Sequence, residues 1–151
     1  MKRLLLLAAL VAIPLTAIAQ SPTSPAAPST PAEFVKARQQ YMGRGGGALQ
    51  LMKQTAESGG DLAALAPRIR ALTAWSQLLP TLFPEGSTTE TSDARPEIWS
   101  NPTGFAAAAT RFQTAVQGLA APAAAGDRAA FMTAWNAAHD ACSACHDDFK
   151  N

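Results

Sequence analysis

The sequence predicts an all-α protein, an antiparallel four-helix bundle, on three observations. Alanine is abundant and β-branched residues are sparse, no segment alternates with a period of two, and apolar residues recur every three or four positions. Four stretches carry this helical period, and short to moderate links join them. Because bundles of this kind bind ligands between facing helices, we expect the functional site there.

The N-terminal part of the chain is expected to lie outside the bundle. Residues 1–19 begin with two basic side chains, continue with an apolar run and end in Ala-Ile-Ala, which is the layout of a cleavable secretory signal peptide. Pro14 interrupts the run, which is shorter than the ~20 residues that span a bilayer, so a membrane anchor is disfavoured. Residues 20–32 are rich in Pro, Ser and Ala and predict a flexible linker. The bundle domain is therefore expected over residues 33–151.

Charge excludes one class of partner. Cleavage after residue 19 would remove Lys2 and Arg3, and the remaining basic side chains nearly balance the 11 acidic ones without forming a basic run. Such a chain has no electrostatic footprint for nucleic acid. No later apolar segment is long enough to suggest membrane association, so we expect a soluble protein of the periplasm.

The first two helical stretches each contain an irregularity. The first covers residues 32–58 and includes "GRGGG" at 43–47, where each internal glycine costs ~1 kcal/mol relative to alanine. Either the helix is loose there or something packs very close to its backbone; a phosphate-binding loop would need a preceding strand and a Gly-Lys-Ser/Thr sequence. The second covers residues 61–82, with Asp61 as N-cap. Its Pro67 predicts a kink, or a helix start near Ala66 after a separate turn.

The second half of the chain contains a long loop and two more helical stretches. Residues 83–101 are rich in turn formers, and a loop of this length in a compact domain tends to be functional or disordered. Asn101-Pro102 opens the third stretch, which "APAAAG" closes. The fourth begins after the N-cap Asp127 and runs to the end of the chain. Trp75, Trp99 and Trp135 are expected to pack in the core or against a cofactor.

The fourth stretch ends with the motif that carries the chemistry. Cys142-Ser143-Ala144-Cys145-His146 is C-x-x-C-H, the attachment signature for c-type haem. On a helix, Cys142 and Cys145 stand one turn apart on one side, so both thiols can reach the two vinyl groups along one porphyrin edge. His146 follows at once and directs its imidazole toward the iron.

Three other roles for the two thiols fit the sequence less well. A disulfide would close so short a loop that it would stabilise little. A thioredoxin-like pair is expected after a strand at a helix start, although a haem-free thiol redox protein stays as a remote alternative. A zinc site needs four ligands. His139 lies two turns before His146 on the same face, ~10 Å away, so the two histidines could not readily complete a tetrahedral site with the two cysteines. His139 is expected to be a packed or surface residue.

The sequence resembles the cytochromes c′, the class II c-type cytochromes. A C-terminal C-x-x-C-H after four helical stretches is typical of that family, and the resemblance covers residues 33–151. It includes "RQQYM" in the first stretch, "TETSDARPEIW" in the long loop and the ending "CSACHDDFK". The "GRGGG" run departs from it.

The resemblance implies one covalently attached haem c and assigns a role to several residues. Cys142 and Cys145 would bind the haem, and His146 would be the axial iron ligand. Met42 would lie on the distal side of the iron. The remaining cofactor-binding positions are Arg38 and Gln39 against the propionates, Thr89 and Glu90 in the loop, and Lys150, which stands where many members have arginine and lacks its planar fork.

The function implied by the resemblance is gas binding. Five-coordinate, high-spin iron would bind nitric oxide and carbon monoxide, with electron transfer to an unidentified redox partner as an additional role, and members commonly form homodimers through their first two helices. The alternative is a six-coordinate, low-spin electron carrier in which Met42 is the second axial ligand. Scattered carboxylates and the lack of a nucleophile–base arrangement predict that the protein is not an enzyme.

Overall fold

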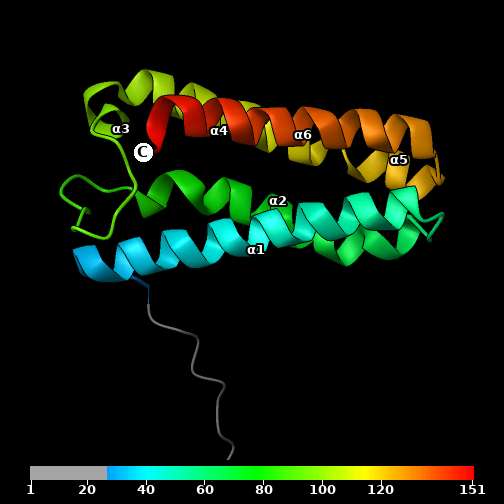
Figure 1. The fold of residues 1–151 in the computed structure, drawn as a ribbon, viewed down its shortest axis with the longest axis horizontal. Coiled ribbons are helices and arrows are strands. Elements are labelled where there is room, and N and C mark those ends of the chain that lie inside the picture. Colours follow the sequence, from blue (N-terminus) through cyan, green and yellow to red (C-terminus); the bar gives the residue numbers. More distant parts are fainter. Residues whose placement is uncertain (1–26) are drawn as a thin grey trace, which may run out of the picture.

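The computed structural model describes residues 27–151. The predicted signal peptide, residues 1–19, and the first part of the predicted linker lie outside the described residues. The described part is all-helical, and four long helical segments pack side by side (Figure 1), so the prediction of a four-helix bundle is confirmed. The elements are α1 (Pro31–Glu57), η1 (Ala63–Leu65), α2 (Ala66–Leu78), η2 (Leu79–Leu82), α3 (Glu97–Ser100), α4 (Pro102–Gln117), α5 (Ala120–Ala125) and α6 (Arg128–Phe149).

The four long segments alternate in direction along the bundle. Figure 1 shows α1 and α4 running one way and α2 and α6 running back. As a result, the start of α1, the connection between η2 and α3, and the C-terminus all lie at one end of the molecule, while α5 lies at the other. No helix among the described residues is long and apolar enough to cross a membrane.

A capping box fixes where α1 begins. The Thr30 hydroxyl accepts a hydrogen bond from the Glu33 amide at 3.3 Å, and the Glu33 carboxylate accepts one from the Thr30 amide at 3.0 Å. Hydrogen bonds from the Ser29 amide and hydroxyl, and then those from Thr30, lower the pKa of Glu33. The helix therefore starts at Pro31, and the last two residues assigned to the linker belong to it.

The glycine run lies inside a continuous helix. α1 shows no break over residues 43–47, so the helix is not interrupted there. Close packing against the backbone, the second predicted explanation, applies to Gly45, which is buried. A Cβ added at Gly45 would stand 2.5 Å from Cζ3 of Trp75 on α2, so the indole packs directly on the helix backbone. Gly43, Gly46 and Gly47 have open space around them. Gly45 thus sets how closely α1 and α2 approach.

The second helical stretch begins as one of the two predicted alternatives. The Asp61 carboxylate accepts a hydrogen bond from the Ala63 amide at 2.9 Å and organises the turn that leads into η1. α2 then starts at Ala66, with Pro67 in its first turn. Backbone amides in the first turn have no acceptor within the helix, so the missing amide hydrogen of proline costs no hydrogen bond there.

Two boundaries differ from the sequence prediction. The segment predicted as one loop, 83–101, contains the short helix α3, which starts after Pro96 because the fixed φ of proline favours a helix start. The "APAAAG" segment does not simply close the third helix: α4 ends at Gln117, and α5 forms a separate short helix that ends at Gly126 with φ 67°. Asp127 caps α6 as predicted, accepting from the Ala130 amide at 3.0 Å.

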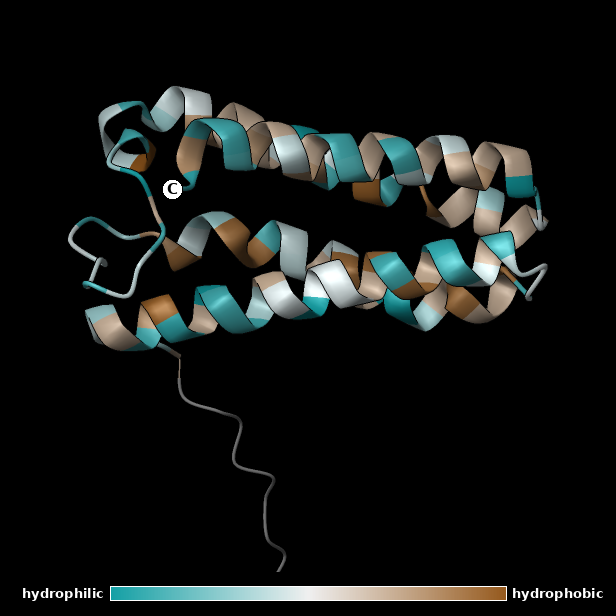
Figure 2. Cartoon of the chain, viewed as in Figure 1, coloured by the Kyte–Doolittle hydropathy of each residue, from teal (hydrophilic) through white to brown (hydrophobic). Residues whose placement is uncertain are grey.

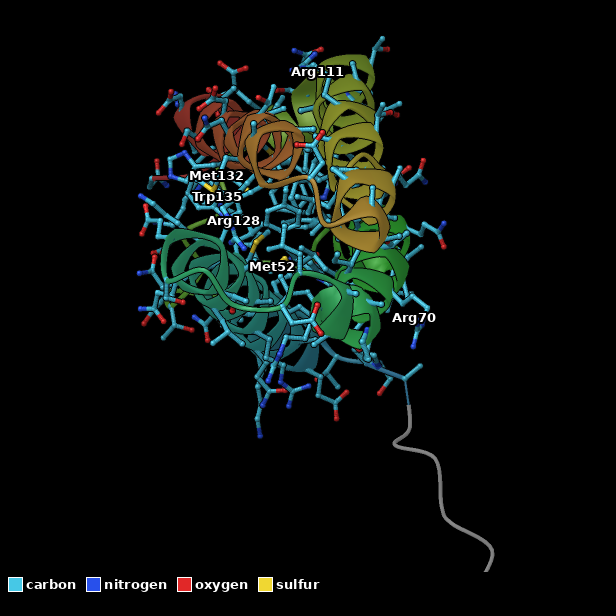
Figure 3. The ribbon with its side chains drawn as sticks, turned by 90° about the vertical axis from the view of Figure 1, so that its right-hand side faces the viewer. Met52, Arg70, Arg111, Arg128, Met132 and Trp135 are labelled. Atoms are coloured by element: carbon cyan, nitrogen blue, oxygen red, sulfur yellow. The ribbon has the colours of Figure 1, made fainter. Side chains whose placement is uncertain are left out.

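The core is a continuous apolar interior between the four long segments. Figure 2 shows hydrophilic and hydrophobic bands alternating along each helix, as expected for helices with one buried face. Looking along the bundle, Figure 3 shows Met52 and Trp135 directed inward and Arg70 and Arg111 outward. Trp75 and Trp135 are buried, which confirms their predicted place in the core, and Trp99 is half-buried.

Direct links between α1 and α6 are concentrated in one half of the bundle. The Trp135 indole donates to the Leu49 carbonyl at 2.8 Å. The Arg128 guanidinium donates to the carbonyl of Ala56 and, at 3.1 Å, to that of Gly60, so it covers the C-terminal end of α1. At the other end of the bundle the two helices are bridged by other parts of the chain.

We expect alanine to have opposite effects at two neighbouring glycines of α1. Gly45→Ala should lower the free energy of unfolding by about 1–3 kcal/mol, because its methyl group collides with Trp75. Gly46→Ala, the matched control in open space, should raise it by about 0.5–1 kcal/mol through better helix propensity. Denaturant unfolding of both variants measures this. Equal effects at the two positions would contradict the close packing at Gly45.

Candidate functional site

A cavity lies between α1 and the C-terminal half of α6, at the end of the bundle where the chain terminates. Its volume is about 280 Å³, close to the lower end of the range of small-molecule sites, about 300–1,000 Å³. One wall is formed by α1, the facing wall by the end of α6, and the base by aromatic side chains. Its lining includes five of the residues predicted to bind a cofactor or iron in addition to His146: Arg38, Gln39, Met42, Cys145 and Lys150.

The C-x-x-C-H motif forms the last two turns of α6. Cys145 and His146 line the cavity, whereas Cys142, one turn earlier, is half-buried against the main core. Both thiols are free. Burial raises the pKa of Cys142 to about 11, helped by the neighbouring Cys145, and burial also raises the pKa of Cys145. Both sulfurs are therefore protonated at neutral pH, and they stand one turn apart on α6, with Cys145 in the cavity wall and Cys142 beside it.

His146 is held in the form that can bind a metal. Partial burial, and then the nearby Lys150 ammonium, lower the pKa of its imidazole, although the residue stays largely exposed at the mouth of the cavity. A neutral imidazole has a free lone pair on one ring nitrogen, which is what coordination to iron requires. Among the residues described, no group of three or more His, Cys, Asp or Glu side chains could hold a metal ion. The imidazole alone therefore suits the iron of a haem better than a bare ion.

Arg38 is a buried cation on the opposite wall. It is only 5% exposed, and its guanidinium donates to the Leu82 carbonyl at 3.2 Å, the Ser87 hydroxyl at 2.9 Å and the Ser92 hydroxyl at 3.3 Å. It also donates to the Ser87 carbonyl and lies 4.7 Å over the centre of the Phe83 ring. Within residues 27–151 no carboxylate pairs with it. A buried cation without a carboxylate partner, beside a cavity, favours an anionic group there.

The segment 92–94 crosses from this wall to the end of the chain. It lines the cavity and pairs with the C-terminus: the Asn151 amide donates to the Asp93 carbonyl at 2.9 Å, and the Arg95 amide donates to the Phe149 carbonyl at 3.0 Å. The Lys150 ammonium lies 3.4 Å from the Asp93 carboxylate. Lys150 is thus both a cavity residue and part of a short antiparallel bridge with Ala94.

The remaining predicted residues divide into two groups. Gln39 lines the cavity and donates to the Thr91 carbonyl at 3.2 Å, and Met42 is half-buried one turn further along α1. Thr89 and Glu90 are not brought to the cavity: the Thr89 hydroxyl bonds that of Thr91 at 3.0 Å, and Glu90 is exposed. The loop approaches the cavity two residues later, through Ser92 and Asp93.

His139 lies on the surface of α6, as the sequence predicted. Its ring stacks on that of Trp135 with 5.1 Å between centres and an interplanar angle of 19°. Its Nδ1 is 3.6 Å from the Asp140 carboxylate, and it does not line the cavity. His139 therefore takes no part in the site.

Sequence reasoning missed several residues of the cavity. Ser87 is buried and holds Arg38, although a serine in a polar loop gives no sign of burial. Phe83, Phe105 and Phe149 form a row of edge-to-face contacts, with ring centres 5.0 Å and 5.4 Å apart. Phe83 falls in the segment predicted as a loop, and the helical period of the sequence does not show that the three rings form the base of one cavity.

These residues fit a haem. Two thiols on one turn followed by an imidazole match the attachment edge and iron of the group, the aromatic base suits its apolar ring, and Arg38 suits a propionate. Cys142, Cys145 and His146 would hold the group on α6, while Arg38 and Gln39 on α1 would meet its charged edge.

Comparison with known proteins gives the same result. The sequence pattern of the family described as Cytochrome C′ matches residues 33–150. Cytochrome c′ of Rhodospirillum rubrum is 30% identical over 154 residues, covering 99% of each chain. The crystal structure of cytochrome c′ from Rubrivivax gelatinosus superposes with a TM-score of 0.73 at 30% identity, covering 81% of this chain and 98% of the other.

A third relative was solved with a ligand. This is a leucine-to-valine variant of cytochrome c′ from Alcaligenes xylosoxidans in complex with nitric oxide. It superposes with a TM-score of 0.74 at 29% identity, and the match covers 82% of this chain and 98% of the other. The family pattern, the long relative and the shared bundle all agree with the motif and the cavity. The chain belongs to the cytochrome c′ family of c-type haem proteins.

Proposed function

We propose that this chain is a periplasmic haem protein that binds nitric oxide and carbon monoxide at five-coordinate, high-spin iron. The observation that carries the proposal is the chemical difference between the two cavity walls. The α6 wall offers the Cys145 thiol and the His146 imidazole, with Cys142 one turn earlier, whereas the apolar side chains of the α1 wall are Val35 and Met42. One bound haem would supply an iron with one open coordination position, facing α1.

The α6 wall would attach and orient the group. Cys142 and Cys145 would hold the group through thioether bonds, each made by adding an S–H across a vinyl group, with sulfur on one carbon and the proton on the other and no net change in electrons. Because burial raises the pKa of Cys142 to about 11, its thiol stays protonated at neutral pH before attachment. His146 contributes its neutral nitrogen on the same side, because α6 continues without a break through the motif.

The α1 wall would select the gas. Arg38 and Gln39, which line the cavity, donate to the 82–92 segment and would meet the charged edge of the group, which leaves neither side chain to stabilise a polar ligand at the open position. What remains beside the open position is apolar and crowded, which suits a small uncharged ligand that needs no hydrogen bond. The nitric oxide complex of the relative from Alcaligenes xylosoxidans supports this assignment.

The same fold allows the alternative in which Met42 completes the coordination. The thioether is half-buried on the cavity side of α1, and methionine–histidine ligation would raise the reduction potential and close the gas site. We favour the open site and assign electron transfer a secondary role, with binding rather than catalysis as the main activity. Export by the N-terminal segment would place the protein in the periplasm.

Protonation of Cys142 has a measurable consequence before haem attachment. Because only the thiolate reacts with iodoacetamide, alkylation of Cys142 in the folded chain should be on the order of 100-fold slower at pH 8 than in the chain unfolded by guanidinium. Its rate should rise about tenfold per pH unit up to about pH 11. Equal rates in the folded and unfolded chains would contradict the buried thiol.

Replacement of Met42 by leucine separates the two coordination states. With an open site, Met42→Leu should leave the high-spin ferric spectrum unchanged and carbon monoxide affinity within about twofold, because leucine has similar bulk. Met42→Ala should accelerate carbon monoxide association by about tenfold, since the smaller side chain relieves crowding. The exposed His139→Ala is the control. A sulfur-to-iron band in the parent protein that Met42→Leu abolishes would establish the six-coordinate alternative.

We also propose a homodimer formed through α1 and α2. Leu78, near the end of α2, is 43% exposed and is the large hydrophobic side chain that the described part of the chain leaves most open. Leu78→Arg should shift the protein to monomer in sedimentation equilibrium, whereas Ala124→Arg on exposed α5 should not. A parent protein that is monomeric at all concentrations would refute the dimer.

A further inference from the structure

Among the described residues, no hydrogen bond joins the cavity end of α1 directly to α6. Within the described residues, the hydrogen bonds that join these helices involve α1 from Leu49 onward, through Trp135 and Arg128. Met42 lies seven residues before Leu49, which corresponds to ~10 Å along the helix. The three turns of α1 that face the cavity therefore extend beyond the last direct link to α6.

Residues 92–94, called the strap below, bridge this gap. At one end, the Ser92 hydroxyl accepts from Arg38, and the neighbouring Thr91 carbonyl accepts from Gln39. At the other end, Asp93 accepts from the Asn151 amide and pairs with Lys150. Figure 1 shows this segment running between the level of α1 and the C-terminal end of α6.

Arg38 also connects α1 to α6 through the base of the cavity. Its guanidinium lies over Phe83, which contacts Phe105 of α4, and Phe105 in turn contacts Phe149 of α6. The strap and this aromatic row both begin at Arg38 and both end at Phe149–Asn151. One buried guanidinium is thus the point on α1 where both connections meet.

We propose that Arg38, Ser87 and Ser92 are positioning residues for the gas site, acting through the strap to set the separation between the Met42 wall and the His146 wall. This inference rests on the proposed function, because it concerns the room left beside the iron. Ser87 contributes by presenting a hydroxyl and a carbonyl to Arg38 from a buried position. None of the three needs to touch the bound gas.

The physical reason is the position of the last direct link. A helix fixed at one end and tied at the other keeps a defined distance from its neighbour, and loss of the tie leaves the free turns able to move. Those turns would open more often while the turns beyond Leu49 stay protected. Since the iron would be fixed to α6, each such opening enlarges the space on the distal side.

The test uses the haem-loaded protein and the double variant Ser87→Ala/Ser92→Ala. Losing two hydrogen bonds to a charged donor should accelerate amide exchange of residues 35–42 roughly tenfold, with residues 49–56 unchanged. Carbon monoxide association should accelerate by a similar factor. Asp93→Asn, which weakens only the exposed ion pair at the other end, should have a smaller effect of about threefold or less.

Two control variants lie outside the strap. Ser100→Ala removes an exposed hydroxyl and Glu85→Gln an exposed carboxylate, and both should match the parent protein. Unchanged exchange at residues 35–42 would overturn the proposal, as would an equal rise along all of α1, or faster exchange without faster carbon monoxide association. A six-coordinate spectrum of the parent protein would refute the proposed function. The exchange comparison would then be made in Met42→Leu, in which no thioether can tie α1 to the iron, so the failure of the proposed function and the failure of this proposal stay distinguishable.

Discussion

The guanidinium of Arg38 is buried beside the cavity with no carboxylate among the described residues to neutralise it. Burial lowers the pKa of this group, yet arginine keeps its proton, so the charge must be satisfied by neutral acceptors or by an anion. The loop supplies carbonyl and hydroxyl oxygens, and for that reason the 82–92 segment folds back over α1. The cavity owes its shape on that side to this one unneutralised charge.

The opposite wall depends on the continuity of α6. Asp127 starts the helix, Trp135 and Arg128 fix its first half to α1, and its second half places Cys145 and His146 in the wall of the cavity. The bundle thus keeps a close-packed core in one half and leaves room for a large planar group in the other. Stability and function therefore occupy different halves of the same helix pair.

The bundle and its chemistry could be predicted from the sequence because both are local patterns. Helical period, the caps at Asp127 and Asn101, and the C-x-x-C-H spacing each involve residues within a turn or two. Tertiary contacts could not be read in this way. Gly45 is explained by Trp75, thirty positions later, and Ser87 is buried only because Arg38 reaches it. Resemblance pointed to Thr89 and Glu90, whereas the loop turns toward the cavity at Ser92 and Asp93. α1 begins inside the segment predicted as linker, although Thr30 and Glu33 have the spacing of a capping box, which is a signal in the sequence itself.

The central claim is that the two walls play different parts, with α6 binding the iron and α1 leaving it open. A crystal structure of the ferric, haem-loaded protein tests this most directly, because it gives the distances from iron to His146 and to Met42 in one measurement. The account predicts thioether bonds at Cys142 and Cys145, a bond from iron to the His146 imidazole, and a Met42 sulfur well beyond bonding distance. A Met42 sulfur bonded to iron would contradict it.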